Sequence, residues 1–260
     1  MRILFIGDVV AKPGRTAVLD RIQDLREQHA ISLAIMNAEN LAGGFSITPS
    51  LGEQLFASGI DVMTSGNHIF DKKEAIPYIQ KQSRLLRPAN YPPGTPGSGI
   101  WIGNVTGVPV AVMNLMGRVF MPPSDDPFRT VDSLLQTIQP DVKVRIVDMH
   151  AEATSEKVAM GWYLDGRVSA VVGTHTHVQT SDERILPEGT AYLTDIGMTG
   201  SHGGVIGMNT ADVIARFTSV TAGRAGHASG DVRICATVID VDIETGKARS
   251  IERLNLKHEA

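Results

Sequence analysis

RILFIGDVVAKPGR, residues 2–15, passes from a short apolar run to an acidic residue and then into the start of a helix. The apolar run, residues 2–7, ends in a Gly-Asp pair, which is typical of a buried strand bounded by a turn. Pro13 and Gly14 open a helix that we expect to continue to about residue 29, with an apolar face. A strand followed directly by a helix is the unit from which parallel sheets are built.

The same unit recurs in the next fifty residues. Residues 32–36 read as a second buried strand, and residues 61–64 as the start of a third. Between them Thr48 has the character of a helix N-cap with Pro49 at the first helical position, and we expect this helix to end near Ser58. The first third of the chain therefore predicts a sheet of parallel strands joined by helices.

The second half of the chain mixes hairpins with strand-helix units. Strands are expected at residues 143–149 and 168–173, with a helix from about 155 to 165 between them. Two hairpins are expected, one over residues 100–115 that turns at 106–107, and one over residues 231–256 that turns at 244–246. We infer two packed sheets with helices outside them, in a single domain that spans residues 1–260.

Composition narrows the classes of function. Hydrophobic residues make up 42% of the 260 residues, the formal charge is −4 and the pI is about 6.1. No basic stripe follows the chain, so we expect small substrates rather than long nucleic acid. The one cysteine, Cys235, lies in an apolar run and is expected to be a small buried residue in a reducing compartment. No apolar run of about 18 residues is present, so we expect a cytoplasmic protein with no membrane association.

Residues able to bind a metal ion follow five of the expected strands. Ligands collect at the carboxyl ends of strands in open α/β sheets, so these residues should converge on one crevice although they are far apart in sequence. One such residue alone would more often be a turn or cap residue, and the prediction depends on their number. They are Asp8, Asn37, Glu39, Asn40, Asn67, His68, His150, His175 and His177.

The order of these blocks resembles the metal motifs of the calcineurin-like metallophosphoesterases. The longer stretches GDVVAKPGR, NAENLAGGF, GNHIFD, DMHAEATSEK and GTHTHVQT are similar to the YmdB-like branch of that superfamily. This resemblance implies a four-layer α/β/β/α sandwich of two mixed sheets and a phosphodiesterase with two divalent metal ions. It further implies hydrolysis of small phosphodiesters such as 2′,3′-cyclic nucleotides, by a metal-bridging hydroxide that attacks phosphorus in line.

The resemblance also assigns roles. It implies that Glu39 bridges the ions, that Asp8, Asn40 and His177 complete the first ion, and that Asn67, His150 and His175 complete the second. His68 would protonate the departing oxygen. Mixed nitrogen and oxygen ligands suit transition metals, and Fe or Mn is expected. Two departures from the wider superfamily stand out: Val10 replaces a histidine, and Glu39 replaces the bridging aspartate.

Several alternatives stay open at this stage. The same scaffold could carry a nuclease, a phosphomonoesterase, or a nucleotide-binding regulatory module with slow turnover, and a homo-oligomer is possible. Asp71 could orient His68 or serve only in a turn. Five further residues could border the substrate cleft or have structural roles only: Gly43, Gly44, Phe45, Arg118 and Asp195.

Overall fold

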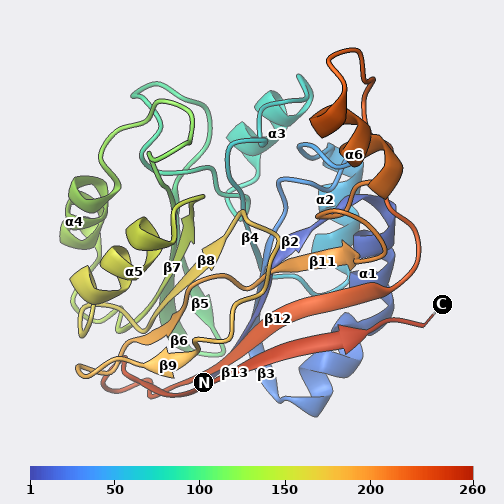
Figure 1. Ribbon diagram of the computed structural model, residues 1–260. Helices are drawn as coiled ribbons and strands as arrows, with labels where there is room; N and C mark the ends of the chain where they lie inside the picture. The colour runs from blue at the N-terminus through green and yellow to red at the C-terminus, as the bar shows by residue number, and fades with distance from the viewer. Residues whose placement is uncertain (260) are drawn as a thin grey trace.

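Two β-sheets lie face to face and helices cover the outer face of each, as the computed structural model shows for residues 1–259 (Figure 1). The seven-stranded sheet has the order β2-β11-β12-β1-β3-β4, with β13 paired to β12. Its strands are β1 (Arg2–Ile6), β2 (Asp8–Val9), β3 (Ile31–Asn37), β4 (Val62–Thr64), β11 (Met198–Ser201), β12 (Val232–Val241) and β13 (Ala248–Lys257).

The second sheet has six strands in the order β5-β6-β7-β8-β10-β9. These are β5 (Ile100–Val105), β6 (Val108–Met116), β7 (Val144–His150), β8 (Ala170–Thr174), β9 (Arg184–Ile185) and β10 (Ala191–Leu193). The helices are α1 (Ala11–Gln28), α2 (Pro49–Ala57), α3 (Ala75–Lys81), α4 (Pro127–Thr137), α5 (Thr154–Tyr163) and α6 (Thr210–Thr218). None of the helices in residues 1–259 is long and apolar enough to cross a bilayer.

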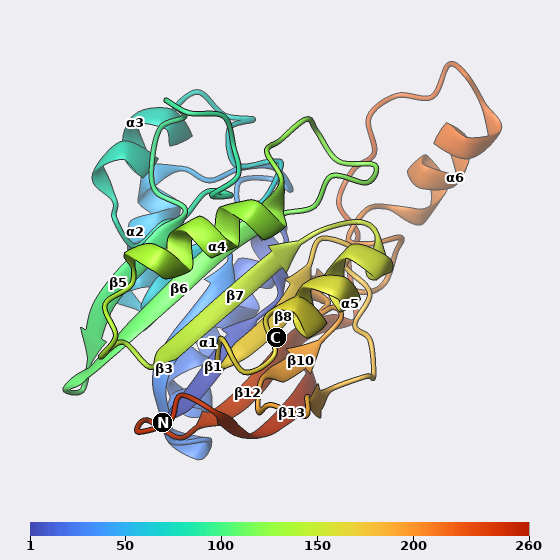
Figure 2. The ribbon, with the colours of Figure 1, turned by 90° about the vertical axis from the view of Figure 1, so that its left-hand side faces the viewer.

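Side chains that alternate along β1 explain why the layers form. Ile3 and Phe5 point into the core between the two sheets, whereas Leu4 and Ile6 point into the core beneath α1, α2 and α3. A third core packs α4 and α5 against the six-stranded sheet (Figure 2). Each fully buried side chain of this size contributes about 1.5–3 kcal/mol. The predicted four-layer sandwich is confirmed.

Parallel pairing brings several strand ends to the same edge of each sheet. β1, β3 and β4 run parallel in the seven-stranded sheet, and β6, β7 and β8 run parallel in the other. The hairpins lie outside these parallel blocks, since β5 pairs antiparallel with β6 and β13 with β12. The polar residues predicted at five strand ends therefore come from both sheets.

Local predictions can be compared with the structure at single residues. The Thr48 hydroxyl accepts from the Leu51 amide at 3.3 Å, so the predicted cap is confirmed. The hairpin turn at 106–107 is confirmed, and both residues have positive φ, as its tight type requires. Cys235 is fully buried, and burial raises the pKa of its thiol to about 12, so it is a core residue.

The sequence prediction did not include α3, α4 or α6. For α4 a signal was present: the Asp126 carboxylate caps the helix by accepting from the amides of Phe128 and Arg129, and Pro127 occupies the first helical position. α6 differs from the other helices because no residue in it is buried. It projects from the body of the molecule together with the segment that follows it (Figure 2).

Candidate metal centre

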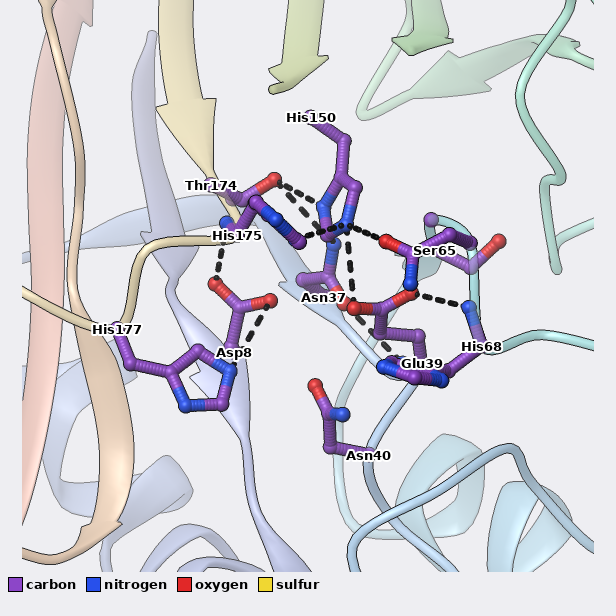
Figure 3. A network of polar contacts seen from close by, with 12 residues as sticks. Asp8, Asn37, Glu39, Asn40, Ser65, His68, His150, Thr174, His175 and His177 are labelled. Atoms are coloured by element: carbon purple, nitrogen blue, oxygen red, sulfur yellow. Dashed lines mark hydrogen bonds and ion pairs between the residues drawn. The ribbon is translucent and has the colours of Figure 1, made fainter. Parts of the chain in front are cut away.

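The predicted ligands meet where the two sheets adjoin (Figure 3). The seven-stranded sheet supplies oxygen donors: Asp8 at the start of β2, Glu39 and Asn40 just after β3, and Asn67 just after β4. The six-stranded sheet supplies nitrogen donors, with His150 at the end of β7 and His175 and His177 just after β8. A site with mixed donors thus forms only because both sheets are present.

One ring nitrogen, His150 Nε2, is surrounded by three other donor atoms. It lies 3.1 Å from Glu39 Oε1, 3.1 Å from Asn67 Oδ1 and 3.1 Å from His175 Nδ1. A neutral or protonated imidazole nitrogen can offer one lone pair or one hydrogen, so it cannot satisfy all three neighbours. A cation placed among the four atoms would, and Glu39, His150 and His175 lie close enough together to hold one.

Two of the residues predicted to bind the first ion, Asp8 and Asn40, also have atoms without a partner in the part of the chain that the structure describes. Asp8 Oδ1 and Asn40 Oδ1 are both buried and have no hydrogen-bond partner in residues 1–259. His177 Nε2 lies 3.9 Å from Asp8 Oδ1. Leaving polar atoms buried and unpaired costs free energy, about 1–3 kcal/mol each. Two orphaned oxygens among predicted ligands therefore fit a metal ion that binds there.

Each imidazole is fixed through its other ring nitrogen. His150 Nδ1 lies 2.9 Å from the Thr174 hydroxyl, and His175 Nε2 lies 3.1 Å from Glu152 Oε2. His177 Nδ1 lies 3.1 Å from the carbonyl oxygen of Ile206. Metal-binding histidines are usually held in this way, because the second contact sets the tautomer and the ring orientation. The nitrogens left facing the site are His150 Nε2, His175 Nδ1 and His177 Nε2.

The loop that carries two of these histidines has a strained backbone. His175 has φ of 98° and His177 has φ of 63°, in the left-handed region that residues with a Cβ rarely adopt. Between them, the amide and hydroxyl of Thr176 donate to Asp195 Oδ2 at 3.2 and 2.8 Å. Lys157 Nζ pairs with the same oxygen at 2.6 Å, and both side chains of this ion pair are 1% exposed. The buried pair holds the loop in place.

Close approach explains the glycine of the Gly66-Asn67-His68 block. A Cβ on Gly66 would lie 2.0 Å from His150 Nε2, inside the imidazole ring. Any other residue here would push His150 away from the centre. The glycine thus leaves space for the histidine of the opposite sheet.

Glu39 and His150 form a buried pair in which each group shifts the pKa of the other. Burial raises the pKa of Glu39, but the charge and hydrogen bond of His150 and contacts with His68 outweigh it and lower this pKa to about 2. Burial lowers the pKa of His150, but Glu39 outweighs it and raises this pKa to about 9. Burial and the charge of His150 lower the pKa of His175 to about 3. A metal ion would have to displace the proton on His150.

His68 borders the centre without belonging to the ligand cluster. Its amide donates to Glu39 Oε2 at 2.8 Å, and its Nδ1 lies 2.7 Å from Asp71 Oδ2. The Phe45 ring packs edge-on against it, with centroids 5.0 Å apart. His68 lines a pocket of about 370 Å³ together with four of the predicted ligands, Glu39, Asn40, His175 and His177, and we call it the metal pocket. Of the two roles left open for Asp71, this contact supports the one that orients His68.

Comparison with known proteins agrees with these observations. The family model of the YmdB-like protein matches residues 4–254. The 2′,3′-cyclic-nucleotide 2′-phosphodiesterase of Bacillus subtilis is 49% identical over 254 residues, which cover 98% of this chain and 96% of that protein. The chain belongs to the YmdB-like family.

Solved structures show how far this likeness extends. A structure from Mycoplasma pneumoniae described as a novel phosphatase matches with a TM-score of 0.93 at 30% identity, over 99% of this chain and 93% of the other. A structure from Staphylococcus aureus described as a 5′-nucleotidase has a TM-score of 0.62 at 15% identity, over 100% of this chain and 55% of the other. The latter shows that the YmdB-like chain shares its fold with that protein.

Sequence reasoning missed the residues behind the ligands. The Thr174 hydroxyl, which contacts His150, donates to Asp148 Oδ1 at 2.7 Å, and Asn37 and Thr64 also contact this buried carboxylate. Asp148 precedes His150 by two residues, so it points to the same side of β7, which was the available signal. Asn37, first considered as a ligand, instead accepts from the Glu39 amide at 3.1 Å and shapes the turn after β3.

The residues that could border the substrate cleft differ in whether they line the metal pocket. Phe45 and Gly44 line the metal pocket, whereas Arg118 does not. The Arg118 amide is held by Glu156, and its side chain is exposed. Val10, noted above as a departure from the wider superfamily, lines the same pocket as Asn40.

Proposed function

We propose that this chain is a metal-dependent phosphodiesterase that hydrolyses 2′,3′-cyclic nucleotides, with two ions of Fe or Mn. Membership of the YmdB-like family and 49% identity to a phosphodiesterase of this specificity support the reaction. The observation that carries the metal requirement is the pair of buried, unpaired oxygens on Asp8 and Asn40. Mixed carboxylate, amide and imidazole donors suit transition metals.

The ligand sets would divide between the two halves of the centre. Asp8, Asn40 and His177 would hold one ion, and Asn67, His150 and His175 the other, with Glu39 shared between them. When bound, two such ions supply charge stabilisation to the phosphoryl group and a nucleophile at neutral pH. The chain's own residues fix the ligand nitrogens through Thr174, Glu152 and the Ile206 carbonyl.

His68 is placed to supply a proton to the departing ribose oxygen. Its contact with Asp71 uses Nδ1, which leaves Nε2 as the ring nitrogen available to the metal pocket. An alkoxide is a strong base, so a proton donor at this place lowers the barrier for its departure.

A panel of substrates tests this proposal against its rivals. The protein, purified without chelator and supplied with Mn or Fe, should hydrolyse adenosine 2′,3′-cyclic phosphate faster than the 3′,5′-cyclic isomer or a phosphomonoester. Faster hydrolysis of the monoester would instead make it a phosphatase. Metal-loaded protein that binds the cyclic nucleotide but does not turn it over would be a regulatory module.

A further inference from the structure

A second pocket continues from the metal pocket toward α6. It has a volume of about 480 Å³, and three residues, Phe45, Met208 and Arg216, line both pockets. Its remaining walls come from the segment after His68 and from the segment that follows α6. Because it is rich in cations, we call it the basic pocket; its lining also includes Asp71, Lys72, Arg224 and Ala225.

The cations of the basic pocket have no anionic partner. Among residues 1–259, Lys72, Arg216 and Arg224 form neither an ion pair nor a side-chain hydrogen bond, although their charges converge on one space. The only carboxylate in the lining is Asp71, and its Oδ2 is already in contact with His68 at 2.7 Å. Like charges gathered without a counterion raise the energy of the site, and an anionic ligand would remove this cost.

The scissile phosphate can account for Arg216, which also lines the metal pocket, but not for Lys72 and Arg224, which line only the basic pocket of the two. In the proposed function that phosphate lies among the metal ligands, and a nucleoside 2′,3′-cyclic phosphate has no other charge. A second anion, attached to the same substrate, is needed to reach the basic pocket. On a ribonucleotide whose 2′ and 3′ oxygens are taken up by the cyclic phosphate, the one remaining ribose hydroxyl that can carry a phosphate is on the 5′ carbon.

We propose that the basic pocket binds a phosphate on the 5′ oxygen of the substrate, so that the preferred substrate is a 2′,3′-cyclic nucleotide that also carries a 5′-phosphate. This inference rests on the proposed function. Phosphate of this kind has two sources, a free 5′-phosphorylated nucleotide or the end of an RNA strand. Either one places the planar guanidinium groups of Arg216 and Arg224 against phosphate oxygens, which they suit in geometry.

The exposed apolar side chains beside the basic pocket fit the rest of such a substrate. Phe45 is 43% exposed and Ile206 is 52% exposed, and both line the metal pocket near the proposed path. An aromatic ring and an aliphatic side chain can cover a ribose or a base without selecting its identity. Recognition of a strand end alone also needs no basic stripe along the protein.

Three substrates test the proposal: adenosine 2′,3′-cyclic phosphate, its 5′-phosphorylated form, and the ApA dinucleotide with a terminal 2′,3′-cyclic phosphate. At least one phosphorylated substrate should show kcat/KM about tenfold or more above the first, mainly through KM, because charged hydrogen bonds add binding energy. The gain should shrink as salt concentration rises. Whichever of the two gains more identifies the source of the phosphate.

Variants connect the gain to the basic pocket. The rise in kcat/KM that a 5′-phosphate gives should disappear in Arg216→Ala/Arg224→Ala. If this double variant folds poorly, Arg224→Ala alone is measured instead, and the rise should be smaller in it than in the wild type. The matched control is Lys143→Ala/Lys247→Ala, which removes two charges from another basic pocket at the opposite end of β7 and should keep the gain.

The outcomes separate this inference from the proposed function. No hydrolysis of any cyclic substrate by the metal-loaded wild type would contradict the proposed function itself. Hydrolysis of adenosine 2′,3′-cyclic phosphate without any gain from a 5′-phosphate would overturn the basic pocket alone. A gain that persists in Arg216→Ala/Arg224→Ala, or that the control variant also loses, would overturn it as well.

Discussion

The two sheets contribute different chemistry to the centre. Every oxygen donor comes from the seven-stranded sheet and its loops, and every imidazole comes from the six-stranded sheet. The nitrogen side is braced, since each imidazole has a partner on its second ring nitrogen. The oxygen side is held only in part: Asp8 Oδ2 accepts from the His175 amide and Glu39 Oε2 from the His68 amide, but Asp8 Oδ1 and Asn40 Oδ1 are buried without a partner in residues 1–259.

This difference separates the donors that the protein itself orients from the atoms that would gain a partner only from an ion. Hydrogen bonds within the protein already orient the imidazoles, so their positions do not depend on a metal. Glu39 is paired with His150, but one oxygen each of Asp8 and Asn40 is buried without a partner in residues 1–259. The six-stranded sheet therefore orients the nitrogen donors, whereas the seven-stranded sheet supplies oxygens that a cation would neutralise. Variants on the two sides should behave differently.

The largest effect is expected from Glu39→Gln on the oxygen side. Glu39 contacts His150 and the His68 amide and would be shared by both ions, so loss of its charge should loosen both ions and reduce turnover to background. Asn40→Ala removes one neutral ligand and should be less damaging. Metal content and kcat of both variants measure this. Near-normal metal content and turnover in Glu39→Gln would show that Glu39 is not the shared ligand.

His68→Ala should separate catalysis from metal binding. It lies beside the ligands, so the variant should keep its metal ions while kcat on adenosine 2′,3′-cyclic phosphate falls about 10²–10⁴-fold. The loss on bis-p-nitrophenyl phosphate should be much smaller, because nitrophenolate leaves without a proton. Asp71→Asn should show the same substrate dependence to a lesser degree. Equal losses on both substrates would make His68 a positioning residue, and loss of metal would make it a ligand.

Asp195→Ala tests the support of the nitrogen side. It leaves the Lys157 ammonium buried without a partner and releases Thr176, so the free energy of unfolding should fall by about 3–5 kcal/mol. The exposed pair of Arg249 and Asp242 is the matched control, and Arg249→Ala should cost less than about 1 kcal/mol. Chemical denaturation measures both. Similar small losses in the two variants would show that the buried pair does not hold the loop.

The smallest effect should come from Thr174→Val, which removes one hydroxyl and keeps the shape of the side chain. Without the contact to His150 Nδ1, metal affinity should weaken by about 10–100-fold. Thr237→Val is the control, since that hydroxyl is also buried but donates to the Glu252 carbonyl, away from the centre. Metal titration measures the affinity of both variants. Equal affinities would show that the Thr174 hydroxyl does not support metal binding by His150.

The sequence was informative about the centre because its ligands follow strands. Short apolar runs bounded by turn residues placed the strand ends, and parallel pairing within each sheet together with the packing of the two sheets brought residues such as Asp8 and His150 together. What lies behind the ligands could not be predicted. Lys157 lies in α5 and Asp195 lies 38 positions later, just after β10, so their pairing depends on how α5 packs on the six-stranded sheet. The exposed helix α6 was also missed, although Asn209 caps it by accepting from the Asp212 amide at 3.2 Å.

The metal content of the wild-type chain tests the central claim most directly. Protein purified without chelator and saturated with Mn or Fe should contain two equivalents of transition metal per chain by elemental analysis. Asp8→Asn/Asn40→Ala, which alters the orphaned oxygens, should keep no more than one. A wild-type value that stays near zero after metal is added would contradict the account of these oxygens as metal ligands.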